Sequence, residues 1–200
     1  MPRITSDAPV THATVPTHPA LRRGTDALTR LYSRPGFLLR RAGQIAAAVF
    51  ENECRPLGLT PAQYGTLTVL QACPGLDQAT LARALGYDKV TMLRILRGLE
   101  SRGMVARDFA AGQRRRLMLE ITPDGAALLR SAARNAERAG RRLLAPLSAT
   151  EQAQLLGLLQ KLTASLEGEA RAGWSAPDQV PAPVRRPASS GRGAGAKQRR

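Results

Sequence analysis

A helix–glycine–helix–glycine–hairpin pattern between residues 75 and 120 restricts the fold of this chain more than any other feature. The pattern predicts a short helix over residues 78–85, which ends at Gly86 because a positive φ costs glycine little. A second helix is predicted from residue 89 to about 102, and Gly103 ends it in the same way.

Two strands are predicted directly after this helix pair, over residues 104–109 and 116–121. Leu117, Leu119 and Ile121 alternate with more polar side chains, the period of a half-buried strand. Two short helices joined by a glycine turn and followed by a hairpin are typical of a winged helix-turn-helix. In that fold the second helix enters the DNA major groove, which is about 12 Å wide.

The first turn of the second helix is expected to face the base edges, since Met92, Leu96 and Leu99 form its inner face. Arg94 can read guanine or hold a phosphate, and Val90 and Leu93 can pack against thymine methyl groups. Consecutive arginines at the hairpin tip can enter the minor groove. The predicted DNA contacts are Arg83, Lys89, Val90, Thr91, Leu93, Arg94, Arg97, Arg114, Arg115 and Arg116, with Arg107 extending the basic surface.

The net charge of +15, from 30 basic and 15 acidic residues, favours a polyanionic partner. Lys89, Lys161 and Lys197 are the only lysines. Arginine suits bidentate contacts to phosphate and guanine, so double-stranded DNA is the expected partner. The alternative is a non-specific basic nucleic-acid-binding protein, associated with the nucleoid or with RNA and driven by its tails.

The rest of the chain predicts a mainly α fold, with the hairpin as its only β structure. Capping boxes at residues 60–63 and 148–151 predict helix starts. The leucines after Ser148 are too many for a lone surface helix, so they need a partner within the chain or across a dimer. The predicted parts are a disordered arm (1–24), N-terminal helices (25–59), the winged helix-turn-helix (60–122), C-terminal helices (123–172) and a basic disordered tail (173–200).

Taken together, these residues resemble the MarR family of transcriptional regulators over about residues 35–167. The motifs are LGLTPAQY at 57–64, LA at 81–82, LG at 85–86, LESRGMV at 99–105 and the wing end from Leu117 to ITPDG at 121–125. The RPGFLLRR stretch at 34–41 is similar to a subgroup tied to aromatic-acid catabolism. Two positions depart from the family pattern: Gln113 stands where the wing usually has Asp, and Val90 and Leu93 where a polar Ser or Thr is common.

The resemblance implies a homodimer that binds a palindromic operator, repression of a nearby operon, and release by a small aromatic carboxylate or phenolic ligand. It places the terminal helices in a dimerisation domain. The implied interface residues are Phe37, Leu155, Leu158, Leu159, Leu162 and Leu166.

A pocket for an aromatic acid would need a cation and an aromatic hydroxyl. Arg40 or Arg41 and Tyr64 are the candidates, with Gln44 close to the arginines by helical spacing. The alternative is that the arginines are surface charges and that Tyr64 is a core residue.

An enzyme is not expected, because no histidine occurs between about residues 35 and 174 to pair with a nucleophile. Cys54 and Cys73 are too few and too far apart for a zinc site, and no Gly-rich phosphate loop occurs. We therefore expect no cofactor and no metal.

Oxidant sensing by Cys54 is disfavoured, since a helix C-terminus does not stabilise a thiolate. No apolar run predicts a membrane span and no signal peptide is recognisable, so a cytoplasmic location is expected.

Overall fold

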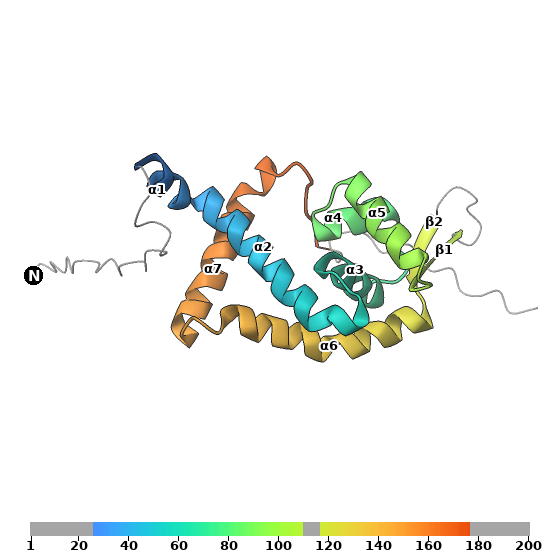
Figure 1. Ribbon diagram of the computed structural model, residues 1–200. Coiled ribbons are helices and arrows are strands. Elements are labelled where there is room, and N and C mark those ends of the chain that lie inside the picture. Colours follow the sequence, from blue (N-terminus) through green and yellow to red (C-terminus); the bar gives the residue numbers. More distant parts are fainter. Residues whose placement is uncertain (1–25, 110–116, 177–200) are drawn as a thin grey trace, which may run out of the picture. The chain divides into compact units, whose positions relative to one another are not determined.

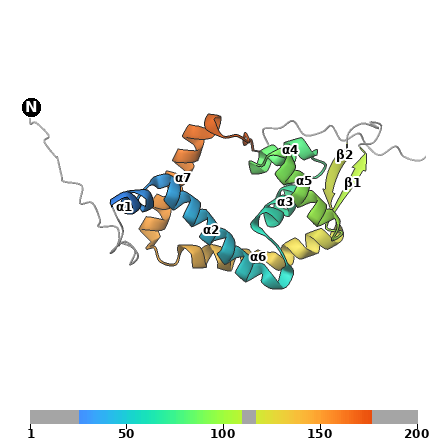
Figure 2. The same ribbon diagram turned by 45° about the horizontal axis from the view of Figure 1, so that its top comes forward.

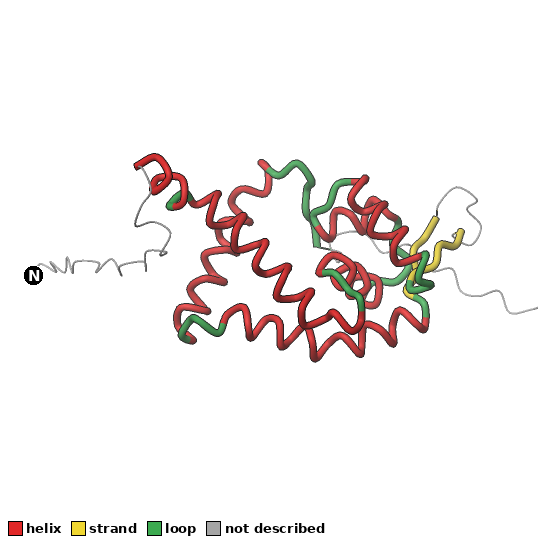
Figure 3. Tube along the Cα trace, in the orientation of Figure 1, coloured by secondary structure: helices red, strands yellow, loops and turns green. Residues whose placement is uncertain are grey.

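The computed structural model describes residues 26–109 and 117–176 and is mainly helical with one two-stranded sheet, as predicted. Figure 1 and Figure 3 show the order of its elements. They are α1 (Asp26–Tyr32), α2 (Pro35–Cys54), the short 3-10 helix η2 (Arg55–Leu57), α3 (Pro61–Ala72), α4 (Gln78–Leu85), α5 (Lys89–Glu100), β1 (Val105–Phe109), β2 (Leu117–Ile121), α6 (Pro123–Leu144), α7 (Ala149–Leu166) and the 3-10 helix η3 (Glu167–Glu169).

The chain divides into two compact units, Met1–Gln44 and Ile45–Arg200. In the described part of the first unit, the hydroxyl of Ser33 donates a hydrogen bond to the carbonyl of Thr29 and ends α1. The rings of Tyr32 and Phe37 lie 5.1 Å apart and join α1 to the start of α2.

The core of the second unit is built around α3, which contacts α4, α5, α6 and β2 (Figure 2). The predicted inner face of the second helix of the pair is confirmed, because Met92, Leu96 and Leu99 are completely buried. Leu67 and Leu70 of α3 are also buried completely. This buried apolar core holds the helix pair in place.

The hairpin pairs β1 with β2 in an antiparallel register in which Val105 faces Ile121. The expected alternation along β2 is wrong at its start, because Leu117 is 42% exposed and Met118 is buried. Met118 is buried because of the segment just before α4. In that segment Leu76 forms a bridge with Leu119 on the other edge of β2, and the Met118 side chain lies beside Gly75.

Local capping chemistry sets the helix starts where the sequence predicts them. Thr60 and Gln63 form a reciprocal capping box at α3, and Ser148 and Glu151 form another at α7. The Thr122 hydroxyl accepts the backbone N–H of Gly125 at the start of α6. Each cap satisfies backbone donors that have no partner inside the helix.

Glu53, in the last turn of α2, ties that helix to α6. Its carboxylate accepts hydrogen bonds from Arg138 and Arg142 at 3.2 Å each. Its backbone carbonyl accepts the Asn135 amide at 2.9 Å. The two arginines hold the pKa of Glu53 below its ordinary value of 4.5.

Replacing Glu53 with glutamine is expected to lower the melting temperature at neutral pH and to lower it less in acid. A carboxyl group whose pKa falls on folding stabilises the fold above its unfolded pKa, and that stabilisation is lost as the pH falls through the folded value. The gap between wild type and Glu53→Gln should therefore shrink below pH 4.5, the ordinary pKa of the group. Thermal unfolding followed by circular dichroism between pH 3 and 7 measures it. Glu137→Gln, in an exposed pair with Arg141, is the control; a gap that is independent of pH would contradict the prediction.

Candidate nucleic-acid interface

The first turn of α5 is locked by the carboxylate of Asp88. Its Oδ1 accepts the backbone N–H groups of Val90 (2.9 Å) and Thr91 (2.8 Å), and its Oδ2 accepts the Thr91 hydroxyl (2.8 Å). The bonds from Thr91, followed by that from Val90, hold the pKa of Asp88 below its ordinary value of 3.8. The turn that a helix-turn-helix presents to bases is thus ordered without DNA.

The outward face of α5 carries the side chains expected to meet DNA. Lys89, Arg94 and Arg97 are exposed. Val90 is 68% exposed, an unusual environment for a large apolar side chain. Thr91 and Leu93 are half-buried, so Leu93 presents less of its surface than the sequence predicts.

The turn between α4 and α5 fixes the angle of the helix pair. Gly86 ends α4 with φ of 66°, in the left-handed region that favours glycine. The amide of Gln78 donates to the carbonyl of Lys89 at 3.4 Å and links the two helix starts. Arg83 is exposed in the last turn of α4, where its guanidinium donates to the Thr80 hydroxyl at 3.3 Å.

The C-terminal end of α5 is held by contacts that sequence reasoning missed. The guanidinium of Arg102 donates to the carbonyls of Leu57 (2.9 Å), the last residue of η2, and Gly58 (2.7 Å), the residue after it. The hydroxyl of Thr122 donates to the carbonyl of Gly103 at 2.7 Å. Because Arg102 is 44 residues from Gly58, no local pattern could have indicated this pairing.

Part of the predicted basic surface is already neutralised. Arg107 on β1 is half-buried and forms an ion pair with Glu100 of α5, so it braces the wing against the helix. The hairpin-tip residues Arg114, Arg115 and Arg116 lie outside the described residues, as does Gln113.

The four residues predicted to bind a ligand occupy two environments. In the first unit, the guanidinium of Arg40 lies 5.0 Å from the centre of the Phe37 ring and donates to Gln44 at 3.2 Å, and Arg41 is exposed. In the second unit, Tyr64 is half-buried with its ring 5.4 Å from that of Phe50.

Arg40 also lines an open cavity of about 710 Å³ at the surface of the first unit. The other lining residues are Leu31, Arg34, Pro35, Gly36 and Phe37. This cavity offers two guanidinium groups beside an aromatic ring. A carboxylate on an apolar ring matches those groups chemically.

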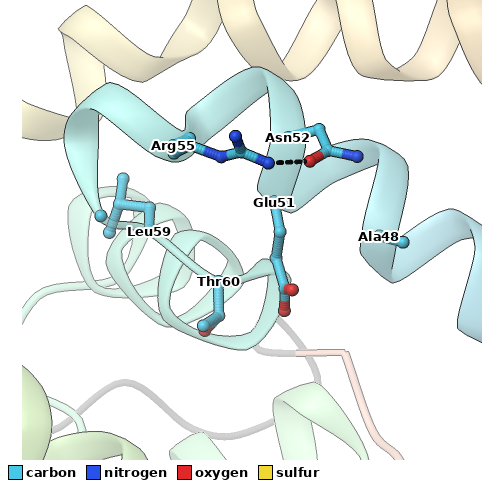
Figure 4. A pocket seen from close by; sticks show the side chains of 7 residues that line it. Ala48, Glu51, Asn52, Arg55, Leu59 and Thr60 are labelled. Carbon is cyan, nitrogen blue, oxygen red and sulfur yellow. Dashed lines mark hydrogen bonds between the residues drawn. The ribbon is translucent and has the colours of Figure 1, made fainter.

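A second, open cavity of about 370 Å³ lies at the end of α2 (Figure 4). The guanidinium of Arg55 donates to the Asn52 side chain there, and the carboxylate of Glu51 comes from the same helix. None of the four predicted ligand residues lines it.

The apolar side of α7 is exposed along the whole helix, in which no residue is buried. Leu158 is 66% exposed and Leu166 is 53% exposed; Leu155 and Leu162 are exposed and Leu159 is half-buried. Among the described residues of the second unit, none buries these leucines, so they form an exposed apolar surface along α7.

Cys54 and Cys73 are not joined in a disulfide. Cys54 is completely buried, and burial raises the pKa of its thiol, which opposes reaction with oxidants. Cys73 is half-buried.

Among residues 26–109 and 117–176, no group of three or more His, Cys, Asp or Glu side chains could hold a metal ion. No helix in those same ranges is long and apolar enough to cross a membrane.

An ordered helix-turn-helix with an exposed basic face and a two-stranded wing defines a winged helix-turn-helix DNA-binding protein. Comparison with known proteins shows which family of winged helix-turn-helix proteins the chain resembles. The MarR family model matches residues 57–116. A putative transcriptional regulatory protein for the hcr operon of Thauera aromatica is 38% identical over 131 residues, which is 64% of this chain and 77% of that protein.

The HTH-type transcriptional repressor Rv2887 of Mycobacterium tuberculosis is 35% identical over 127 residues, covering 64% of this chain and 91% of its own. The chain belongs to the MarR family. Rv2887 has been solved with DNA (TM-score 0.53, 33% identity, 65% and 98% coverage) and with salicylic acid (TM-score 0.53, 35% identity, 65% and 96% coverage). A probable transcriptional regulator from Pseudomonas aeruginosa has a TM-score of 0.64 and 37% identity over 66% of this chain and 99% of that chain.

Proposed function

We propose that this chain is a homodimeric, sequence-specific repressor that binds a palindromic operator through α5 of each protomer. The observation that carries the proposal is the N-terminal half of α5, where Asp88 locks the first turn and Lys89, Val90 and Arg94 are exposed. A pre-ordered turn loses little conformational entropy on binding, which favours sequence-specific contacts over simple attraction to phosphate.

Thr91 supports a more specific proposal about the base it contacts. Its hydroxyl proton is engaged with Asp88, so its remaining lone pairs can only accept a hydrogen bond. In the major groove the exocyclic amino groups of adenine and cytosine are the available donors. We therefore expect adenine or cytosine opposite Thr91 in each half-site.

The dimer part of the proposal rests on the exposed leucines of α7. Replacing Leu158 with glutamate should raise the dimer dissociation constant at least about a hundredfold, because burying a leucine is worth about 1.5–3 kcal/mol and a symmetric interface holds two copies. Sedimentation over a concentration range measures this. Gln160→Glu is the matched control, because Gln160 is exposed and lies on the other side of the same helix by its spacing; equal dissociation constants for the two variants would show that Leu158 is not in the interface.

The effector part of the proposal is release by a small aromatic carboxylate or phenol. It is supported by the pair of Arg40 and Phe37 in a cavity of the first unit, and by the salicylic acid complex solved for the relative Rv2887. Arg41 and Gln44, on the same helix as Arg40, and Tyr64 remain predictions from the sequence.

The test is selection of bound sequences from a random DNA pool, followed by footprinting in excess unrelated DNA. A protected palindrome that survives the competitor, and that is lost when salicylate or benzoate is added, is the expected result. A basic protein that binds by charge alone would yield no common sequence and would lose its footprint in the competitor. If none of the aromatic acids releases the protein from the palindrome, the effector part of the proposal is wrong and the operator part stands.

A further inference from the structure

Helices α3, α4 and α5 and the hairpin form the DNA-binding lobe, and the chain after α7 returns to bond to it. The indole N–H of Trp174 donates to the carbonyl of Ala84 at 3.1 Å. The next backbone N–H, that of Ser175, donates to the carbonyl of Arg83 at 3.2 Å. The backbone N–H of Trp174 donates to the carboxylate of Glu167, in η3, at 2.6 Å. We call the segment from η3 to Ser175 the strap, because it joins the end of α7 to the end of α4.

The strap bonds to carbonyls that a helix cannot satisfy by itself. The last four carbonyls of a helix have no partner inside it. In the turn after α4, the N–H groups of Gly86 and Tyr87 donate to the carbonyls of Ala82 and Arg83. The strap adds a donor for the carbonyl of Ala84 and a further donor for that of Arg83. It therefore completes the C-terminal cap of α4.

Helix α7 is attached to the rest of the second unit at both of its ends. At its start, the side-chain amide of Gln152 donates to the carbonyls of Leu144 at 3.1 Å and Leu147 at 2.9 Å, at the end of α6 and in the turn that follows. At its end, the strap bonds to α4. Among the described residues, none of those in α7 is buried and none belongs to the apolar core of the unit. The orientation of α7 relative to the lobe therefore depends on these two attachments.

The strap reaches the lobe close to the start of α5. Ala84 precedes Lys89 by only five residues, and Asp88 caps the helix between them. The side-chain amide of Gln78, the first residue of α4, donates to the carbonyl of Lys89 and links the two helices again. Because Arg102 holds the other end of α5, the strap bears on the end that is proposed to face the bases.

We propose that the strap sets the distance and angle between α5 of one protomer and α5 of its partner, with Trp174 and Glu167 as positioning residues. It rests on the proposed function, in which α7 lies in the dimer interface. A dimer on a palindrome reads half-sites that are about 34–36 Å apart, one turn of DNA, or a multiple of it. One added base pair moves a half-site by about 3.4 Å and turns it by about 35°. A lobe tied to α7 accepts one spacing, whereas a lobe released from α7 accepts several.

The experiment compares three duplexes: the palindrome selected from the random pool, and two derivatives whose spacer between half-sites is longer or shorter by one base pair. Trp174→Phe keeps an aromatic ring and loses the donor to Ala84, and Glu167→Ala removes the acceptor of the Trp174 backbone N–H. A strap that is open half of the time in each protomer should weaken binding to the selected spacing about fourfold, because both protomers must be closed at once. Affinity for the two altered spacings should be unchanged or higher.

The fluorescence of Trp174 shows whether the strap is closed, because it is the only tryptophan in the chain. Glu167→Ala leaves the indole in place, and Trp174 is 53% exposed in the closed strap. Opening should raise its quenching by acrylamide towards that of a free tryptophan amide. Glu169→Ala is the matched control, since it removes a carboxylate from an exposed position of the same 3-10 helix. This control should change neither the quenching nor the preference for one spacing.

An equal loss of affinity at all three spacings would overturn the inference, because Trp174 and Glu167 would then support only the fold of the lobe. An unchanged spacing preference in the double variant, which lacks both side-chain contacts, would also overturn it. So would a wild-type protein with equal affinity at the three spacings. Each of these results leaves the proposed function intact as long as the wild-type protein still protects the selected palindrome in competitor DNA. Loss of that selective footprint would instead overturn the proposed function.

Discussion

Replacing Gly125 with alanine is expected to lower the free energy of unfolding by about 3 kcal/mol or more. A Cβ at this position would lie 2.1 Å from the carbonyl oxygen of Met104 and 3.0 Å from Cγ1 of Ile121. The first of these contacts is with backbone, which cannot turn aside as a side chain can. The Met104 carbonyl also accepts the backbone N–H of Thr122 at 3.1 Å, so relief of the clash would break a second contact. Since domains are stable by only about 5–15 kcal/mol, this one methyl group is a large perturbation.

Urea unfolding at a fixed protein concentration, followed by circular dichroism, measures the effect. The matched control is Gly140→Ala, on the exposed side of the same helix, where a Cβ meets nothing within 4 Å. That change should raise the free energy of unfolding by up to about 1 kcal/mol, because alanine is the better helix former. Equal stabilities for the two variants would show that the Met104 carbonyl does not press against α6.

Replacing Arg94 with alanine should produce the largest loss of operator affinity without loss of fold. A bidentate contact to guanine contributes about 1–3 kcal/mol of discrimination, and a dimer on a palindrome makes it twice, so about 2–6 kcal/mol is expected. Arg94 is exposed and its neighbours Met92 and Leu96 carry the packing, so the thermal stability should be unchanged.

Affinity for the selected palindrome and for a scrambled duplex should be measured in parallel. Arg134→Ala removes the same charge from an exposed position on α6 and serves as the control. It should weaken both duplexes slightly and equally. If Arg94→Ala behaves in the same way, Arg94 contacts phosphate only and the base-reading role passes to another residue of the turn.

Sequence signals located nearly every helix because helix ends are determined locally. Asp77 and Asp88 cap α4 and α5 through side-chain oxygens that accept N–H groups two or three residues on, and such bonds depend on spacing alone. The inner face of α5 follows from a period of 3.6 in the same way. The existence of the hairpin was equally predictable.

The contacts that join distant parts of the chain were not predictable, because their partners share no local pattern. Arg102 reads from sequence as one more basic residue near a recognition helix, yet it donates to two carbonyls of the segment before α3. Trp174 stands in a Pro- and Ala-rich stretch that suggests no partner, yet it bonds to α4 90 residues away. The burial of Met118 in place of Leu117 depends on Gly75 and on the bridge at Leu76.

The C-terminal end of α5 is fixed by hydrogen bonds, so a rotation about that end displaces the other end of the helix most. Arg102 and Thr122 fix that end to the segments that follow α2 and precede α6. Lys89 lies at the opposite end of a helix of 12 residues, about 18 Å away. A rotation of the lobe by about 10° around the fixed end would move Lys89 by about 3 Å, roughly the length of one hydrogen bond. Small angular changes near Arg102 are therefore magnified at Lys89, in the turn of α5 that is proposed to face the bases.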